Sequence, residues 1–146
     1  MTHGMIELSD EECRDLLRTT SIGRVAVVVY DCPVVLPVNY RLVETTGPVW
    51  LAIRTRPGNV MDQPLTSVGF EIDGIDEVGQ RGWSVLVRGT LHRVDPDAAE
   101  FRQRFDPQPW ITEQRDAWLV IDPFAITGRR VESLSDEFSY HPDAYL

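Results

Sequence analysis

Hydrophobic and polar residues alternate in several short runs along the chain, and these runs predict an antiparallel β structure. The run from Gly23 to Tyr30 is apolar on both faces and rich in β-branched residues, which is typical of a strand covered on both sides. Turn residues at 31–33 and 45–47 separate it from two further apolar runs, 34–44 and 48–55. Three strands joined by short turns predict an antiparallel meander.

Three more strands are predicted in the second half of the chain. Residues 67–73 alternate cleanly between apolar and polar side chains, and residues 82–94 form the longest run of this kind. Gly89 falls on the apolar face of that longer run, which predicts a β-bulge or a bend at a barrel corner. A last strand is expected over residues 117–132, with a break at Pro123.

Helices are predicted only at the margins of this β structure. Ser9 and Glu12 have the spacing of a capping box and open a helix of about three turns. Asp95 and Pro96 predict the start of a second helix over residues 97–105, because proline suits the first helical turn. Six antiparallel strands with marginal helices predict a mostly β (α+β) barrel, since closing a sheet removes its exposed edges.

Length and composition narrow the functional classes. The 146 residues suit one domain, which we place at 1–132, followed by an acidic C-terminal tail at 133–146. The net charge of −9 argues against nucleic acid and anionic membranes as partners. All 14 basic residues are arginine, so a lysine Schiff base and a P-loop lysine are excluded. With two separated cysteines, no spanning apolar run and no signal-peptide pattern, we expect a soluble, cytoplasmic protein with reduced thiols.

At two places, polar residues interrupt the apolar strands and suggest a ligand site. Arg54 and Thr55 end the third apolar run, where a guanidinium beside a hydroxyl is suited to gripping a phosphate. The alternative is a solvated arginine pair at a turn. Pro37 cannot donate to a sheet ladder, so Asn39 beside it can offer its donor and acceptor to a ligand. The alternative here is an edge-strand proline and a turn asparagine.

Other chemistry-bearing residues give weaker signals. His3, His92 and His141 lack accompanying ligands at metal-site spacing, so no metal site is predicted. Glu71 and Asp73 share one strand face; they are either an acid–base pair or carboxylates that face solvent or bind an arginine such as Arg88. Trp110, in the loop sequence PQPW, is expected either in a core or interface or laid over the cleft of a neighbouring subunit.

Taken in order, the segments GRVAVV, PVVLPVNY, IRTRPG, VGFEID, GWSVLVRG and TGRR cover nearly the whole chain after its first helix. In this order and spacing the sequence resembles the pyridoxamine 5′-phosphate oxidase-like FMN-binding split-barrel family, and within it the nitroimidazole-resistance-type branch. The resemblance implies a six-stranded antiparallel split β-barrel with short flanking helices. It also implies a homodimer with a flavin in each of two clefts at the subunit interface.

The resemblance assigns roles to individual residues. It places Arg54 and Thr55 at the cofactor phosphate, and Trp83 and Ser84 near the ribityl and phosphate end. The strand beside the flavin ring would contain Pro37, Val38, Asn39 and Tyr40, and the late arginines Arg129 and Arg130 would reach the site or the interface. One departure is Val60, which stands where the family has a lysine. Arg56 is the cation that could replace that lysine.

The function implied is that of a flavin-dependent oxidoreductase. Its cofactor would be FMN or a deazaflavin coenzyme, and its partners a second copy of the chain and a small-molecule electron donor or acceptor. No catalytic side chain is assigned, because the cofactor would carry the redox chemistry. The alternative, which Val60 favours, is a non-catalytic dimeric split-barrel protein that has lost its cofactor.

Overall fold

The computed structural model describes residues 2–95, 98–110 and 116–134. These residues form seven strands and two helices in the following order: β1 Thr2–Glu7, α1 Asp10–Thr19, β2 Ile22–Val29, β3 Cys32–Glu44, β4 Val49–Thr55, β5 Leu65–Asp76, β6 Arg81–Arg93, α2 Ala99–Arg104 and β7 Ala117–Leu134. No helix in this described part of the chain is long and apolar enough to cross a membrane.

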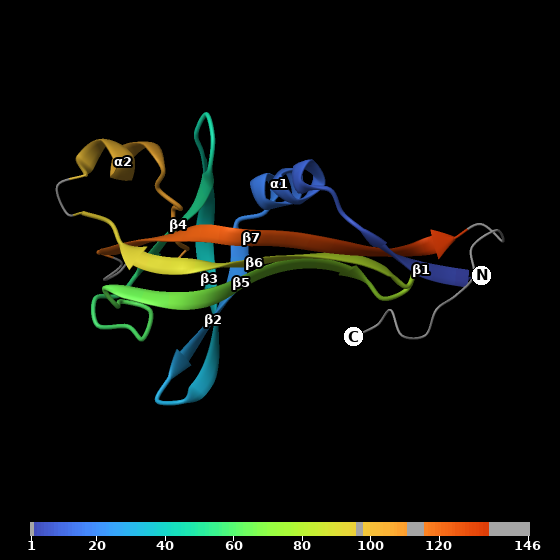
Figure 1. The fold of residues 1–146 in the computed structure, drawn as a ribbon, viewed down its shortest axis with the longest axis horizontal. Coiled ribbons are helices and arrows are strands. Elements are labelled where there is room, and N and C mark those ends of the chain that lie inside the picture. Colours follow the sequence, from blue (N-terminus) through green and yellow to red (C-terminus); the bar gives the residue numbers. More distant parts are fainter. Residues whose placement is uncertain (1, 96–97, 111–115, 135–146) are drawn as a thin grey trace.

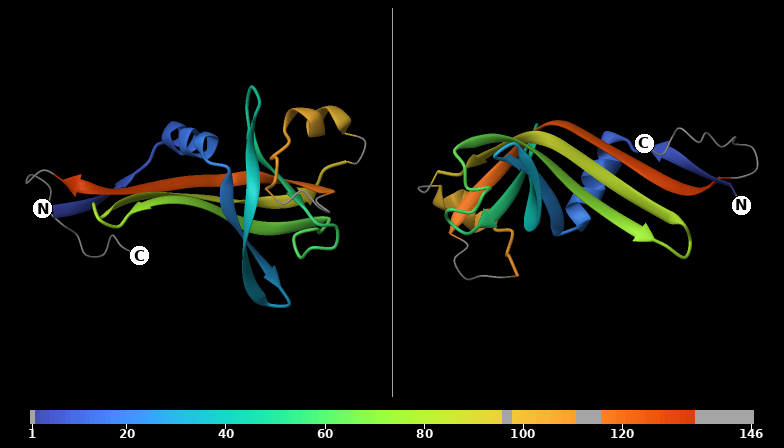
Figure 2. Two further views of the ribbon diagram at one scale, coloured as in Figure 1. Left: turned by 180° about the vertical axis from the view of Figure 1, so that it is seen from behind. Right: turned by 90° about the horizontal axis from the view of Figure 1, so that it is seen from below.

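The strands form one antiparallel sheet in the order β1-β7-β4-β3-β2-β5-β6, and a further pairing of β6 with β7 closes it into a barrel. In Figure 1, β5, β6 and β7 run along the long axis of the molecule, and β2, β3 and β4 cross them. Figure 2 shows α1 packed beside the crossing strands and α2 at the end remote from β1. The mostly β split-barrel fold predicted from the sequence is therefore confirmed, as is the β2–β3–β4 meander.

The sheet has seven described strands where six were expected, because β1 was not predicted. Its sequence, THGMIE, has no sustained alternation of apolar and polar residues. Its partner is the distant end of β7, where Gly4 lies opposite Glu132 and Ile6 opposite Arg130. Long-range pairing of this kind leaves no local signal in the sequence. Because β7 runs to Leu134, the strand passes the expected domain end at 132, and the rest of the expected tail, 135–146, lies outside the described residues.

The longest pairing, between β6 and β7, contains the expected irregularity at Gly89. The register shifts between Arg88 and Gly89, so that Phe124 on β7 has no paired residue on β6. A side chain at Gly89 would overlap the backbone of Asp122, which explains the glycine. The expected break at Pro123 was wrong, because the bulge accommodates the proline and β7 continues through it.

The barrel interior is filled by alternate residues of the strands, among them the fully buried Val25, Phe70 and Leu119. Helix α1 covers one end of it with Cys13 and Leu17. The predicted capping box is present, since Ser9 and Glu12 exchange side-chain to backbone hydrogen bonds of 3.2 and 2.8 Å. This cap fixes the start of α1 against the sheet.

The second helix is shorter than predicted. It spans only Ala99–Arg104, its N-cap position is Ala98, and no side chain caps it. Asp95 accepts the backbone N–H of Ala98 through its main-chain oxygen, and Pro96 and Asp97, where the helix was expected to begin, lie outside the described residues. The chain that follows α2 is what matters for the site described next.

Candidate functional site

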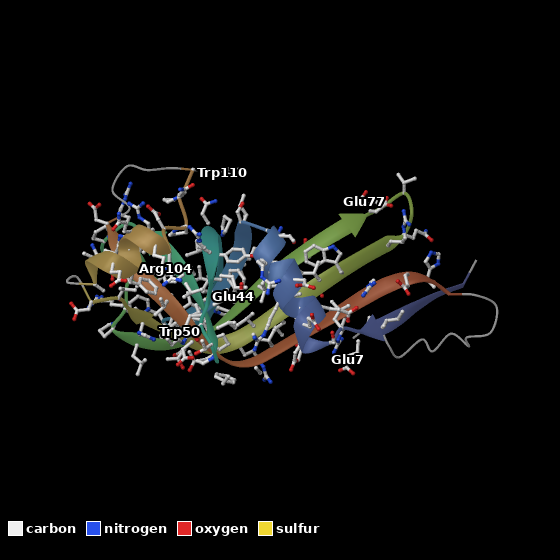
Figure 3. The ribbon with its side chains drawn as sticks, turned by 90° about the horizontal axis from the view of Figure 1, so that it is seen from above. Glu7, Glu44, Trp50, Glu77, Arg104 and Trp110 are labelled. Carbon is white, nitrogen blue, oxygen red and sulfur yellow. The ribbon has the colours of Figure 1, made fainter. Side chains whose placement is uncertain are left out.

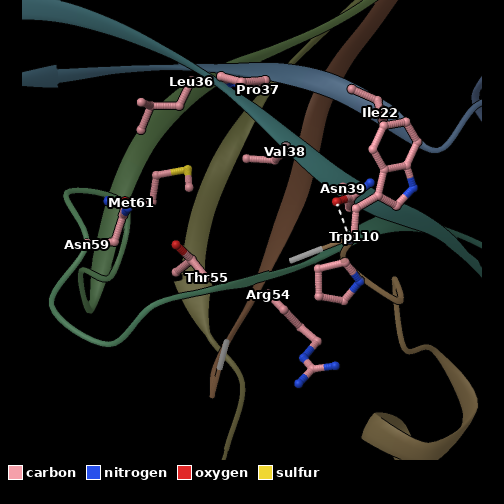
Figure 4. Close-up of a pocket in the computed structure, with 11 residues that line it drawn as sticks. Ile22, Leu36, Pro37, Val38, Asn39, Arg54, Thr55, Asn59, Met61 and Trp110 are labelled. Atoms are coloured by element: carbon pink, nitrogen blue, oxygen red, sulfur yellow. Dashed lines mark hydrogen bonds between the residues drawn. The ribbon is translucent and has the colours of Figure 1, made fainter. Parts of the chain in front are cut away.

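A cavity of about 410 Å³ opens where β3 and β4 meet the chain that follows α2. Figure 4 shows the apolar side chains around it, with the Thr55 hydroxyl and the Arg54 guanidinium toward the bottom of the view and the Asn39 amide beside Trp110. The residues that line this cavity, called pocket one, are Ile22, Leu36, Pro37, Val38, Asn39, Arg54, Thr55, Asn59, Met61, Pro109 and Trp110. Five predicted cofactor residues therefore meet in one place: Pro37, Val38, Asn39, Arg54 and Thr55.

Arg54 and Thr55 line the same pocket but point in different directions, because successive strand residues face opposite sides. Thr55 is buried, with 2% of its surface exposed. The Arg54 guanidinium extends away from the Thr55 hydroxyl toward the chain after α2 (Figure 4). There its Nη1 donates to both carboxylate oxygens of Asp106, at 3.1 and 3.2 Å.

An indole lies under the Arg54 guanidinium. The Cζ atom of Arg54 lies 4.9 Å from the centre of the Trp118 ring, and that of Arg102 lies 5.5 Å from the same ring. Trp118 is the direct partner of Arg54 in the β4–β7 ladder. The Nε atom of Arg102 is buried and has no hydrogen-bond partner among the described residues. Two cations thus contact one indole ring, and one of them, Arg54, is also paired with Asp106.

Asn39 joins the pocket to the same loop. Its Oδ1 accepts the backbone N–H of Trp110 at 3.0 Å, as the dashed line in Figure 4 shows. The Trp110 side chain is 76% exposed and borders pocket one of its own chain. The amide nitrogen of Asn39 is the half of the side chain that this contact leaves to other partners.

Several residues named from the sequence do not line pocket one, among them Tyr40, Arg56 and Val60. Tyr40 is 2% exposed and packs edge-on against Phe70, with ring centres 4.8 Å apart, because it faces the barrel interior. Arg56 is exposed in the turn after β4, and Val60, 38% exposed, does not line the cavity. The pocket is therefore built on residues from both faces of β3, Leu36 and Val38 toward the core and Pro37 and Asn39 outward, and on the end of β4.

Trp83, Ser84 and Arg129 line a different cavity, pocket two, of about 460 Å³. Figure 3 shows Trp110, which borders pocket one, and Glu77, which borders pocket two, well separated along the molecule. The predicted cofactor residues thus fall into two groups within one chain. Arg130 belongs to neither group, since its Nη2 donates to Glu12 at 2.9 Å.

Pocket two also contains the carboxylates of Glu71 and Asp73. Both accept from Nη1 of Arg24, at 3.3 and 3.2 Å, so the arginine that they bind comes from β2 rather than being Arg88. Partial burial, followed by the neighbouring Asp73, raises the pKa of Glu71, and Arg24 opposes this shift. The pair is therefore held by an arginine, which was one of the two interpretations of the sequence.

The two pockets share one face of the sheet. Directly paired residues of antiparallel strands point to the same side. One row of such pairs crosses five strands and consists of Pro37, Arg24, Glu71, Leu86 and Thr127. Pro37 borders pocket one and Glu71 borders pocket two. The outer face of the barrel therefore borders both pockets, with Arg24 between them, although Leu36, Val38 and Thr55 line pocket one from the inner side.

The family model for pyridoxamine 5′-phosphate oxidase matches residues 9–130, which include β2 to β6, most of β7 and every residue of pocket one. The chain belongs to this family. The uncharacterized protein Rv0080 of Mycobacterium tuberculosis is 30% identical to it over 136 residues, which are 87% of this chain and 86% of that protein. The family assignment from the sequence is thus confirmed.

Several solved structures share this fold. The FAD binding protein from Mycobacterium smegmatis is 29% identical, with a TM-score of 0.64 over 87% of this chain and 98% of that one. A structure from Corynebacterium glutamicum is also 29% identical, with a TM-score of 0.71 over 93% and 99%. A Bacteroides thetaiotaomicron protein named for 5-nitroimidazole antibiotic resistance shares the fold, at 13% identity and a TM-score of 0.63 over 90% of both chains.

Sequence reasoning missed several residues that build pocket one. Ile22, Leu36 and Met61 supply apolar surface, and Asp106 supplies the carboxylate at Arg54. Asp106 is 52 residues away from Arg54 in the sequence, so only the folded chain brings them together. The one available signal was the PQPW loop, which was noted for Trp110 alone. Among the described residues, no group of three or more metal-ligating side chains is present.

Proposed function

We propose that this chain binds a flavin at the interface of a homodimer and serves in electron or hydride transfer to a small molecule. The observation that carries the proposal is the composition of pocket one. An apolar wall for a ring system, the Asn39 amide for a polar ring edge and the Arg54 guanidinium for an anion meet in one cavity. The family to which the chain belongs and the FAD binding relative from M. smegmatis support it.

The residues present fit such a cofactor. Arg54 would hold the phosphate, and Arg102, whose Nε has no hydrogen-bond partner among the described residues, contacts the same Trp118 ring. Asn39 would donate to and accept from the heteroatoms of the ring edge. When bound, the flavin supplies the redox chemistry, and the chain supplies binding, orientation and exclusion of water.

A homodimer would reunite the two groups of predicted residues. In a two-fold dimer the same face of each subunit meets its copy, so pocket two of one subunit can approach pocket one of the other. The outer face, which borders both pockets, also exposes large apolar side chains, including Ile75 (74%), Val35 (60%) and Leu86 (42%). Trp83, Ser84 and Arg129 would then act from the partner subunit, near the ribityl and phosphate end.

FMN is the cofactor that we propose first, because a single guanidinium in pocket one matches a terminal phosphate. A deazaflavin coenzyme is the alternative, since Val60 leaves the site without the family lysine. FAD is a third possibility, brought by the name of the M. smegmatis relative. A titration with each compound, followed by tryptophan quenching, ranks them directly.

A non-catalytic binding role is the second candidate function. Two observations favour it: Val60 replaces the lysine, and the Arg54 guanidinium is already paired with Asp106. Under this interpretation the barrel would dimerise and bind no flavin. The cofactor titration separates the two candidates, because a protein that is colourless and binds none of the three compounds fits only the second.

The phosphate assignment is tested with Arg54→Ala. Loss of a charge-assisted hydrogen bond costs roughly 1.5–3 kcal/mol, so we expect FMN affinity to fall by about ten- to a hundredfold. The affinity for riboflavin, which has no phosphate, should change little. Arg41→Ala is the matched control, since Arg41 is exposed on β3 and lines neither pocket. Equal FMN affinity in the wild type and Arg54→Ala would remove the assignment while leaving the fold unaffected.

A further inference from the structure

The segment Asp106–Trp110, which we call the strap, follows α2 and closes one side of pocket one. It is anchored at both ends by side chains of the pocket. Asp106 accepts two contacts from Nη1 of Arg54, at 3.1 and 3.2 Å, and the backbone N–H of Trp110 donates to Asn39 at 3.0 Å. Two buried prolines, Pro107 and Pro109, stiffen the chain between these anchors.

The strap uses the same polar groups that the proposed function assigns to the ligand. A phosphate needs the N–H donors of Arg54, and a flavin ring edge needs the amide of Asn39. Both are already bonded to the strap in the structure. Ligand and strap therefore compete for the same atoms.

Charge makes this competition strongest at Asp106. Its side chain is 33% exposed and that of Arg54 is 18% exposed, so the ion pair is partly shielded from water. A phosphate and the Asp106 carboxylate would repel each other if both approached the same guanidinium. Arg102 contacts the same indole ring as Arg54 and adds positive charge on that ring.

We propose that Asp106 is a built-in competitor for the anionic end of the ligand, so that the strap must release Arg54 before a phosphate binds. This inference rests on the proposed function and adds a residue that sets affinity and charge selectivity. The opposite role for Asp106 would be to hold the Arg54 guanidinium in the position that binds the ligand. The two roles predict changes of opposite sign when the carboxylate is neutralised.

The first experiment compares wild type, Asp106→Asn and the control Asp15→Asn by titration with FMN and with riboflavin. Asp15 forms a more exposed ion pair with Arg18 on α1, away from pocket one. Replacing a charged acceptor with a neutral one should tighten FMN binding by about tenfold. Riboflavin affinity should stay unchanged, and Asp15→Asn should match the wild type. Unchanged or weaker FMN binding in Asp106→Asn overturns the proposal.

A second experiment follows the strap itself and does not depend on flavin. Hydrogen exchange of the peptide that contains residues 106–110 is measured in the wild type, with and without inorganic phosphate, and in Asp106→Ala. The Gln108 amide donates to Asp106 at 2.8 Å and the Trp110 amide to Asn39, so both should exchange faster in Asp106→Ala. Phosphate should increase the rate of hydrogen exchange of the same peptide in the wild type.

The two measurements keep the proposals apart. If no variant binds flavin, the proposed function fails, while faster exchange in Asp106→Ala and with phosphate still supports competition at Arg54. If the strap exchanges at the same rate in Asp106→Ala as in the wild type, the strap proposal fails whatever flavin does. Circular dichroism of each variant confirms that the barrel remains folded.

Discussion

The phenol of Tyr40 is enclosed between α1 and the barrel core. Its hydroxyl donates to the main-chain oxygen of Leu17 at 2.7 Å and contacts the Thr20 hydroxyl. That carbonyl belongs to the last turn of α1, where helical carbonyls lack intrahelical partners. Burial raises the pKa of Tyr40 to about 12, and the Thr20 hydrogen bond acts in the opposite direction.

This environment predicts the alkaline stability of the protein. The folded state keeps the Tyr40 proton up to about pH 12, whereas the unfolded chain loses it near pH ~10. The contribution to stability is therefore complete below about pH 10 and is lost as the pH rises toward the folded value. Tyr40→Phe should flatten this decline and cost about 1–2 kcal/mol at neutral pH, because the Leu17 carbonyl loses its donor.

Urea unfolding of both proteins at neutral and alkaline pH measures both effects. Tyr30→Phe is the control, because Tyr30 is 99% exposed. An alkaline decline as steep in Tyr40→Phe as in the wild type would contradict the expected role.

At the same scale, the sequence could identify polar residues in apolar strands but not which way they face. Both sets of alternate positions in the 34–44 run contain apolar residues, so the pattern did not show whether Asn39 or Tyr40 faces the ligand. The structure turns Asn39 toward pocket one and Tyr40 into the core. Packing of Tyr40 against Phe70 and α1 decides the orientation, and those contacts are not local in the chain.

At the scale of elements, α1 was predictable because its signals are local. The Ser9–Glu12 capping box holds the pKa of Glu12 below its usual range, chiefly through the backbone N–H of Ser9. The stabilising effect of Glu12 is present above its unfolded pKa and is lost as the pH falls through the folded value. By contrast, β1 and the β4–β7 pairing join distant segments, and nothing in either strand alone specifies its partner.

Ser9→Ala tests how much the cap contributes to the barrel. The substitution removes the acceptor for the Glu12 backbone N–H, and we expect a loss of about 1 kcal/mol in the free energy of unfolding. Thermal and urea unfolding measure it, with Ser67→Ala on β5 as the exposed control. A loss no larger than that of the control would mean that the cap adds nothing measurable to the stability of the barrel.

For the whole molecule, family motifs predicted the barrel and half of the candidate site. They could not show that Arg54 and Arg129 lie in different cavities, because the distance between cavities depends on how the sheet coils. They also could not reveal Asp106, because its contact with Arg54 depends on the folded barrel and on the path of the loop after α2. The strand order, with β7 between β1 and β4 and also paired with β6, is what creates both features.

The division of the predicted residues between two cavities has a genetic consequence under the proposed dimer. Each cleft would combine Arg54 from one subunit with Arg129 from the other. Two inactive parents, Arg54→Ala and Arg129→Ala, would complement each other when co-expressed, because every hybrid pair retains one cleft with both arginines. Differently tagged chains allow hybrids to be isolated, and we expect about half the wild-type flavin content per hybrid. Hybrids with as little bound flavin as their parents would show that each site is built within a single subunit.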